Sequence, residues 1–296
     1  MAGDSYDGHF QNLWVRGKTH GGHYDVDESH DRYVLKDYFH KRPALNSVLN
    51  TGFSDADAQA AANTAIRLAE KVANEHFEVV GSGATTASVT FDHDYPGITL
   101  TTGTSDNHTT TITPHLDADH TGWSLAGMWD THRSVHFVTS ITIGPTITTY
   151  SIHAGLKLTL DPAFMTDDDQ IYFVSCTDDD LGILTSNGNL HVVHSIGGTE
   201  YISDLGITLA ANTTYNLKIA IDSDRKATVY VNGTQYSLTS ATTSGGVYTG
   251  VGTTASAALT DNIALIPYIG VRCHVGSQAR ALILHYLKMS RNWTTS

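Results

Sequence analysis

Histidines and aspartates gather between residues 108 and 120, where their side chains could hold a metal ion. The set comprises His108, His115, Asp117, Asp119 and His120. Residues two apart in a β-strand share a face, so Asp117 and Asp119 would converge there and His115 would join them. The segment lacks a spacing with a known mechanism, such as His-Glu-x-x-His. A solvated loop is therefore the favoured interpretation, and no metal ligand is assigned.

Two acidic runs could supply part of a calcium shell, Asp167-Asp168-Asp169 and Asp178-Asp179-Asp180. Calcium needs six or more oxygen ligands, several of them from carboxylates. Neither run has the Asp-x-Asp-x-Asp-Gly order of a calcium loop. Solvated loop ends beside strands are favoured, and the sequence predicts no cofactor, although calcium binding stays open.

Hydrolysis of a glycan would need two carboxylates about 5 Å apart, one of them acting as an acid. The chain has five glutamates, and of these only Glu200 lies well inside the predicted β-region. A Gly-x-Ser-x-Gly nucleophile motif is also absent, and the glycine pairs 197–198 and 245–246 lie between β-segments rather than at the start of a helix. The sequence therefore predicts no catalytic residue and no enzyme.

Composition narrows the classes of partner. The chain has 296 residues, only 16% charged, with a net charge of −13. Nucleic acids and anionic membranes attract basic surfaces, so neither is an expected partner. The first residues have no apolar stretch typical of a signal peptide, and no apolar run reaches transmembrane length, which predicts a soluble protein made in a cytosol. Cys176 and Cys273 are interpreted as buried thiols, with a disulfide between them left open.

Residues 1–53 show neither helical nor strand periodicity, but they are rich in His, Tyr and Asp. Such a segment cannot form a core of its own, and its aromatic side chains are unsuited to a free tail. We predict an extended N-terminal arm that docks on another surface. Its candidate interface residues are Phe10, Trp14, Tyr33, Tyr38 and Phe39.

Residues 54–76 predict a helix. Ser54 is a suitable N-cap, and Asp55 and Asp57 complement the positive end of the helix dipole. Small and apolar residues, among them Ile66, form one stripe along the helix. The stripe either packs on the chain's own sandwich or mediates self-association, for which Ile66 is the candidate contact and a homotrimer the favoured assembly.

Residues 77–296 predict a two-sheet antiparallel β-sandwich of the jelly-roll or concanavalin-like type, because short strands alternate with turn signals. Period-two alternation is clearest in residues 217–221 and 227–231. A polar turn, residues 222–225, joins these two runs. Asn232-Gly233 predicts a type I′ hairpin, and Asn187-Gly188 a second hairpin. The expected strands are 77–80, 86–92, 97–102, 109–113, 134–143, 147–160, 170–176, 181–185, 189–195, 207–210, 214–222, 226–232, 264–274 and 279–290.

Several segments carry a resemblance to a known domain. They are Thr113-Pro114-His115-Leu116-Asp117, residues 154–159, residues 166–173, residues 195–199, residues 222–225, Tyr230-Val231-Asn232-Gly233 and residues 265–271. Together they resemble a concanavalin A/laminin G-like domain found in virion structural proteins of tailed bacteriophages, over roughly residues 75–290. The resemblance implies a capsid decoration protein, a head fibre or a tail-associated module, and no catalytic residues.

Two functions follow from these observations. The first is a capsid decoration or cement protein of a virion assembled in the bacterial cytoplasm, which binds the major capsid protein or other virion proteins through its arm. The alternative is a carbohydrate-binding module of a head or tail fibre that engages the host surface, with Trp123, Trp129, Trp293 and tyrosines as stacking candidates. A secreted hydrolase is disfavoured, because the signal peptide and the paired glutamates are both missing.

Overall fold

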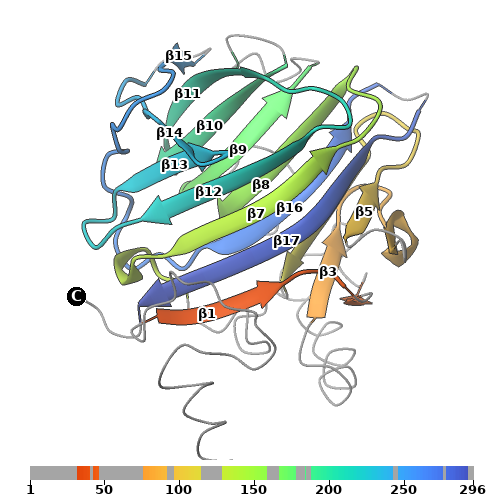
Figure 1. Ribbon diagram of the computed structural model, residues 1–296, viewed down its shortest axis with the longest axis horizontal. Helices are drawn as coiled ribbons and strands as arrows, with labels where there is room; N and C mark the ends of the chain where they lie inside the picture. Colours follow the sequence, from red (N-terminus) through yellow and green to blue (C-terminus); the bar gives the residue numbers. More distant parts are fainter. Residues whose placement is uncertain are drawn as a thin grey trace, which may run out of the picture.

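The computed structural model describes residues 32–40, 43–46, 76–91, 97–114, 129–158, 167–177, 184, 188–242, 246–275 and 278–292. These residues form a two-sheet β-sandwich, which confirms the predicted fold class (Figure 1). Within them, helical structure is confined to the 3-10 turns η2 (Thr86–Ser88) and η3 (Thr131–Arg133). The helix predicted for residues 54–76 lies outside the described residues, except for His76, which opens a strand.

Sheet A is antiparallel throughout its described pairs. Its order is β14 (Thr234–Tyr236), β13 (Ala227–Val231), β12 (Thr214–Ile221), β7 (His136–Ile143), β17 (Ala281–Asn292), β5 (Ile98–Thr101) and β4 (Val89–Phe91). An eighth strand, β1 (Arg32–Asp37), pairs with the end of β17 and lies along that edge in Figure 1.

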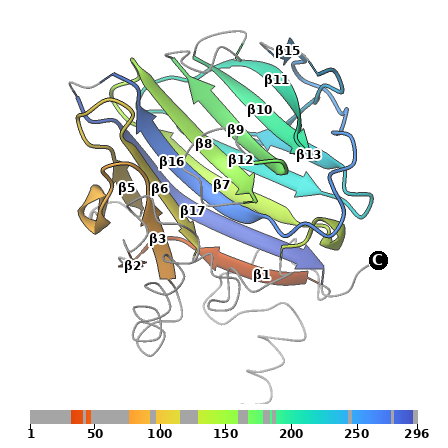
Figure 2. The ribbon, with the colours of Figure 1, turned by 180° about the vertical axis from the view of Figure 1, so that it is seen from behind.

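Sheet B is mixed, because the strand at each of its two edges is parallel to its neighbour. Its order is β15 (Val247–Tyr248), β11 (Thr199–Thr208), β10 (Asn189–Ile196), β9 (Gln170–Cys176), β8 (Tyr150–Lys157), β16 (Ile266–Cys273), β6 (Thr109–Pro114), β3 (His76–Val80) and β2 (Ala44–Asn46). Figure 2 shows this sheet from its outer side, with sheet A behind it.

The core lies between the sheets and follows the period-two pattern of the strands. On β12, Leu217, Ile219 and Ile221 point inward and are buried. Sheet B contributes Ile152, Leu156 and other alternate residues to the same apolar cluster. Apolar burial of this kind contributes about 25 cal/mol per Å² and is the main force that holds two sheets together.

The turn chemistry read from the sequence is confirmed at two hairpins. Val231 and Thr234 are directly paired across Asn232 and Gly233, whose φ angles are 50° and 82°. Positive φ at both central residues defines a type I′ turn. The polar turn 222–225 likewise joins β12 to β13, with Arg225 at φ 62°.

Two predicted strands differ from the observed ones. The expected strand 86–92 begins with the turn η2, because the Thr85 hydroxyl accepts a hydrogen bond from Ala87 N and the Ser88 hydroxyl accepts one from Thr85 N. Such side-chain bonds offer the backbone an alternative to a ladder. The expected strand 207–210 is instead the end of the ten-residue β11, which passes Gly206 in a bulge where pairing shifts from Leu190 to His191.

The hairpin expected at Asn187-Gly188 lies partly outside the described residues. Of the predicted strand 181–185, only Leu184 is described, as a single bridge residue. The described partner strands of β10 are β9 and β11. Three further short strands, β2, β14 and β15, were not expected from the sequence.

The described part of the predicted arm belongs to the sandwich. β1 extends sheet A, β2 extends sheet B, and Phe39 between them is fully buried in the main core cluster. The extended arm predicted for residues 1–53 is therefore corrected for this stretch. Its pattern was hidden because each strand is a short edge strand, whose face is only partly covered.

Candidate functional site

Of the candidate interface residues, Tyr38 and Phe39 are described with their side chains. Phe10, Trp14 and Ile66 lie outside the described residues, and Tyr33 is placed only by its backbone in β1. The Tyr38 ring is half-buried at the outer side of sheet A. Its centroid lies 4.8 Å from that of Tyr286 and 5.6 Å from that of the exposed His40. The trimer interface at Ile66 stays a prediction.

Phe39 turns inward rather than toward a partner. Its φ angle of 50° redirects the chain after β1, and its amide donates to the Asp37 carboxylate at 2.6 Å. The Phe39 ring then lies 5.6 Å from the Phe77 ring inside the core. In this structure Phe39 is a core residue, and the sequence could not distinguish this role from an interface role, because both need a large apolar side chain.

The sequence's metal candidates are only partly described. His115, Asp117, Asp119 and His120 lie outside the described residues. His108 is described, and its ring occupies the space beside Gly83 and Gly103, where a Cβ atom would collide with it. Among the described residues, no group of three or more His, Cys, Asp or Glu could hold a metal ion.

Carboxylates of the first acidic run bind neighbouring segments of the chain. The Asp167 carboxylate accepts a hydrogen bond from Leu158 N at 2.8 Å and lies 3.9 Å from Lys157 Nζ. Asp169 accepts hydrogen bonds from Gly197 N and from the Thr260 hydroxyl. These carboxylate oxygens tie loop segments to sheet B. The run 178–180 lies outside the described residues.

Glu200 lies opposite Ser195 on the outer side of the β10–β11 pair. Burial raises the pKa of its carboxyl, which is half-buried. A raised pKa is what a general acid needs, but hydrolysis also needs a second carboxylate on the same face. Across the sheet, Glu200 is paired with Ser195 on β10, and Ser195 is paired with Gln170 on β9. Neither of these two neighbours is a carboxylate.

Polar residues that the sequence analysis did not single out form a row on the outer face of sheet B. The His153 ring is stacked on Tyr268 at 4.8 Å, its Nε2 lies 3.1 Å from the Thr111 hydroxyl, and Lys157 Nζ lies 4.9 Å from the Tyr268 ring centroid. The sequence signal that could have revealed this row is the alternation of polar residues along β8, namely Ser151, His153 and Lys157.

This row is closed to solvent. His153, Lys157 and Tyr268 are each at most 2% exposed. Burial holds the pKa of His153 well below its usual value, and the charges of Lys157 and Arg272 lower it further. The side chains have the types of a catalytic set, but in this structure they bond to one another rather than face a substrate.

An apolar cluster covers the neighbouring part of the same face. It consists of Tyr172, Val174, Cys176, Leu184, Val193 and Ile202. Leu184 comes from outside the described strands and lies against β9 and β10 through this cluster. At these positions of β9, β10 and β11, the outer face of sheet B is therefore buried.

Both cysteines are free and buried, which confirms the interpretation as buried thiols. Cys176 Sγ lies 3.4 Å from His274 Nε2, which in turn lies 2.9 Å from the Ser151 hydroxyl. All three are almost completely buried. A thiol beside an imidazole is a nucleophile arrangement only where a substrate can reach it, and this one is sealed.

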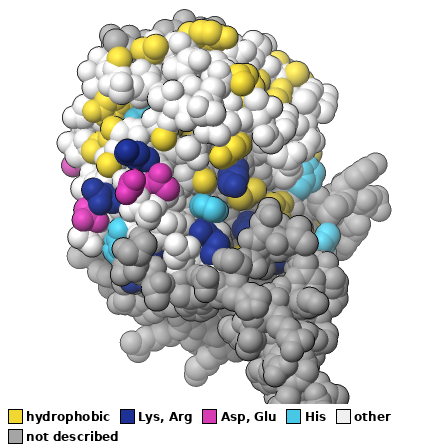
Figure 3. Space-filling view, turned by 60° about the vertical axis from the view of Figure 1, so that its left-hand side comes forward, with side chains coloured by type: hydrophobic (Ala, Val, Ile, Leu, Met, Phe, Trp, Pro, Cys, Tyr) yellow, Lys and Arg dark blue, Asp and Glu magenta, His cyan; other side chains and the backbone are white. Residues whose placement is uncertain are grey.

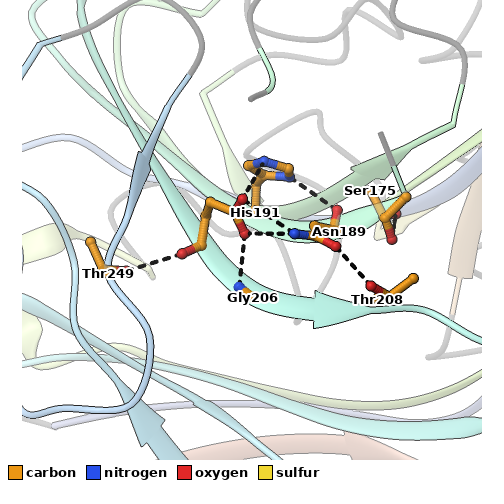
Figure 4. Close-up of polar contacts among 8 residues, drawn as sticks. Ser175, Asn189, His191, Gly206, Thr208 and Thr249 are labelled. Carbon is orange, nitrogen blue, oxygen red and sulfur yellow. Dashed lines mark hydrogen bonds and ion pairs between the residues drawn. The ribbon is translucent and has the colours of Figure 1, made fainter. Parts of the chain in front are cut away.

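A second buried network lies at the β10–β11 bulge (Figure 4). The Asp204 carboxylate accepts hydrogen bonds from Asn189 Nδ2 at 3.2 Å and from Gly206 N at 2.8 Å, and it lies 3.8 Å from His191 Nε2. The Thr249 amide donates to the Asp204 carbonyl at 3.0 Å. The network fixes the bulge and attaches the β15 loop to sheet B.

Next to this network, an aromatic side chain stands in solvent. Tyr248 is 71% exposed, and its ring lies over Gly206, where a Cβ atom would fall 2.4 Å from the ring. Gly250 lies against the same ring. Two glycines thus leave room for this ring beside the backbone, and an exposed aromatic ring can stack on a sugar.

The outer face of sheet A is basic and is partly covered, since Lys288 is 8% exposed and Ser290 is 2% exposed. Its described strand positions carry Arg32, Lys36, Lys218 and Lys288, together with His136. We call these five residues the cationic face. In Figure 3, which shows one side of the molecule, dark blue and cyan side chains lie together near the centre of the view without a magenta one among them.

His136 lies among the cations of this face. Burial lowers its pKa to about 3, and the charges of Arg32, Lys218 and Lys288 add to the effect. His136 is therefore neutral at pH 7, surrounded by three cations on three strands. The Arg32 guanidinium donates to the Ser134 carbonyl at 2.6 Å and to Asn292 Oδ1 at 2.9 Å, both of which are uncharged acceptors.

No family model matches this chain, and no curated protein matches it. Solved structures similar to it include a protein of unknown function from Shewanella oneidensis MR-1, with 11% identity over 74% of this chain and 80% of that chain and a TM-score of 0.45. An alginate lyase from Corynebacterium sp. has 14% identity over 70% and 82%, with a TM-score of 0.41.

A third similar structure is the carbohydrate recognition domain of Emp46p, with 8% identity over 72% of this chain and 87% of that chain and a TM-score of 0.42. The described residues contain no helix long and apolar enough to cross a membrane.

Proposed function

We propose that this chain is a non-catalytic structural protein of a phage particle, of the capsid-decoration type that its sequence resembles. One observation carries the proposal: the groups on sheet B that could do chemistry are buried and bonded within the chain. His153, Lys157 and Tyr268 form one such set, and His191 and Asp204 form another. Titratable groups that are buried and bonded to one another stabilise the fold rather than contact a substrate, which suits a structural protein.

The N-terminal region is the proposed attachment. β1 is paired with β17 over six residues, so the first described residue, Arg32, already belongs to an edge of sheet A. A segment that precedes a fixed edge strand can add contact area on a capsid without a large globular interface. The capsid-binding segment of this proposal is thus residues 1–31 rather than 1–53.

The experiment compares two truncations with the full chain on capsids formed by the major capsid protein of the same phage. Deleting residues 1–31 leaves β1 and Phe39 in place, so we expect an unchanged melting temperature and loss of capsid binding. Deleting residues 1–53 removes both and should also lower the melting temperature. If the shorter truncation still decorates capsids, the attachment proposal is wrong.

A carbohydrate-binding module is the second candidate, favoured by the exposed ring of Tyr248 over Gly206. Aromatic stacking on a sugar ring should make binding depend on this side chain. Tyr248→Ala should abolish signals on a glycan array, while Val275→Ala, which also removes an exposed apolar side chain, should retain them. Equal signals from both variants would exclude Tyr248 as the site.

A further inference from the structure

Two strongly exposed apolar side chains lie close together at and just after the short edge strand β15. Tyr248 is 71% exposed and Val251 is 70% exposed, the two largest values among the large apolar residues that the structure describes. A single exposed apolar side chain is ordinary on a protein surface. Two of them within one short segment form an apolar patch, and such patches mark binding sites. We call Tyr248 and Val251 the edge patch.

Backbone hydrogen bonds attach this segment to both sheets, at the upper left edge of the sandwich in Figure 1. On the side of sheet B, the Thr249 amide donates to the Asp204 carbonyl at 3.0 Å. On the side of sheet A, the Ser237 amide donates to the Gly250 carbonyl at 3.1 Å. A ligand would therefore meet a segment that is already ordered, and its binding would cost little conformational entropy.

Two glycines determine where the Tyr248 ring lies. A Cβ atom at Gly206 would fall 2.4 Å from the ring, and one at Gly250 would fall 3.3 Å from the Tyr248 hydroxyl. Both glycines have positive φ, 68° and 62°, a conformation that residues with a side chain rarely adopt. Gly250 directly precedes Val251, so the hydroxyl end of the ring lies beside the second member of the edge patch.

Charge is absent from the stretch of sequence that carries the edge patch. Residues 234–260 contain no Asp, Glu, Lys, Arg or His. Asp204, which is paired with Tyr248, is only 4% exposed. The stretch instead offers hydroxyls, including those of the exposed Thr253 and Thr254. In Figure 3, the upper part of the visible face carries yellow and white atoms without dark blue or magenta ones.

We infer that the edge patch binds a neutral glycan. The C–H face of a sugar ring would lie on Tyr248, because an aromatic ring offers a large apolar surface. Val251 would cover a further apolar part of the sugar. Sugar hydroxyls would exchange hydrogen bonds with Thr253 and Thr254, since a threonine hydroxyl both donates and accepts. An acidic glycan would lose hydration at its carboxylates without gaining a cation from residues 234–260.

A protein partner fits the edge patch less well than a sugar does. Stable protein interfaces bury about 800 Å² on each partner, which two side chains cannot supply. The inference rests on the second candidate function, the carbohydrate-binding module. To that function it adds the class of glycan and a second contact residue, Val251.

The test measures binding of the full chain to three neutral polysaccharides, maltodextrin, mannan and galactan, and to polygalacturonate as the acidic one. We expect binding to at least one neutral polymer, unchanged as salt is added, and none to polygalacturonate. Val251→Ser should weaken binding about fivefold, as expected for about 1 kcal/mol of lost apolar contact. Val275→Ser is the matched control, because Val275 is 51% exposed outside residues 234–260, and its binding should stay within about twofold of wild type.

Thermal melting of both variants checks that the sandwich stays folded. Equal binding by Val251→Ser and Val275→Ser, or stronger binding of polygalacturonate than of the neutral polymers, would overturn the inference. The carbohydrate-binding module would still stand in that case if Tyr248→Ala abolished binding. Wild-type dimers that Val251→Ser dissociates in sedimentation velocity would assign the edge patch to a second copy of the chain and would also overturn the inference.

Two results would contradict the carbohydrate-binding module itself and the inference with it. One is the absence of binding to all four polymers, and the other is wild-type binding by Tyr248→Ala. Neither result affects the truncation experiment on capsids.

Discussion

Phe39 and Phe77 lie with their ring centroids 5.6 Å apart, and both rings are fully buried. The first comes from the segment between β1 and β2, and the second from β3 in sheet B. Their contact, with the pairing of β1 to β17, makes residues 32–39 part of the folded unit. Among the described residues, the sandwich begins at Arg32.

Phe39→Ala should destabilise the protein by about 3–5 kcal/mol, because it leaves a cavity in a close-packed core. Urea unfolding followed by tryptophan fluorescence would measure the loss. Tyr38→Ala is the control, since Tyr38 is only half-buried on the surface, and it should cost about 1 kcal/mol. Similar losses for both variants would mean that Phe39 does not belong to the core.

His194→Phe should stabilise the protein by about 1 kcal/mol at pH 7. Both ring nitrogens of His194 are buried without a hydrogen-bond partner within the described structure, and its ring stacks on Tyr201 at 4.8 Å. Phenylalanine keeps the stack and removes the polar atoms. Burial also lowers the pKa of His194 to about 4, so the gain should increase as the pH falls from 6.5 toward 4. A destabilised variant at both pH values would contradict this account.

Wild-type stability should fall as the pH decreases from 6.5 toward 3, in part through His136. Burial and the charges of Arg32, Lys218 and Lys288 lower its pKa to about 3, so in this range the unfolded chain binds a proton that the folded chain does not. After allowance for solvent screening, His136→Gln should remove on the order of 2 kcal/mol of that loss at pH 4.5. Unfolding by urea at pH 7.5, 5.5 and 4.5 gives the slope. A variant with the wild-type slope would show that His136 does not contribute.

Gly233→Ala should destabilise the β13–β14 hairpin by about 1 kcal/mol. A Cβ atom at this position would contact nothing within 4 Å, so the effect comes only from its φ of +82°. Chemical denaturation should show the shift, whereas Ser223→Ala in the neighbouring exposed turn should show almost none. A loss in Ser223→Ala equal to that of Gly233→Ala would point to general turn damage instead.

Lys157→Met should cost about 3 kcal/mol, because it leaves the Asp167 carboxylate buried without its nearby cation. The two groups are 3.9 Å apart, and each side chain is at most 3% exposed. The exposed Lys226→Met is the matched change of charge and should stay within about 0.5 kcal/mol of wild type. A small effect at Lys157 would mean that its ion pair with Asp167 contributes little to stability.

Local signals in the sequence identified much of the sandwich. Alternation in residues 217–221 and 227–231 gave the inward faces of β12 and β13, and Asn232-Gly233 gave the turn that follows. These features depend on neighbours a few residues apart. The edge strands were missed for the opposite reason: β1, β2 and β15 are paired with strands that are distant in sequence, and their own patterns are short.

The candidate sites depended even more on long-range pairing. The sequence shows Lys36, Lys218 and Lys288 as three scattered lysines, separated by up to 252 positions when the numbers of the outer two are subtracted (288 − 36). Only the register of β1, β17, β7 and β12 places them in one row. In the same way, the burial of His153 and Asp204 is a property of the folded chain that their sequence neighbours do not show.

By itself, the sequence determined a charge-poor, mainly β chain whose alternating residues must bury one face, because water excludes apolar side chains whatever the topology. The tertiary structure decided which strands are neighbours, and with that which polar residues are sealed and which remain on a surface. Register is a long-range property, and shifting it by one residue would turn every side chain of a strand to the other face. The lysine row and the buried histidines are consequences of that register.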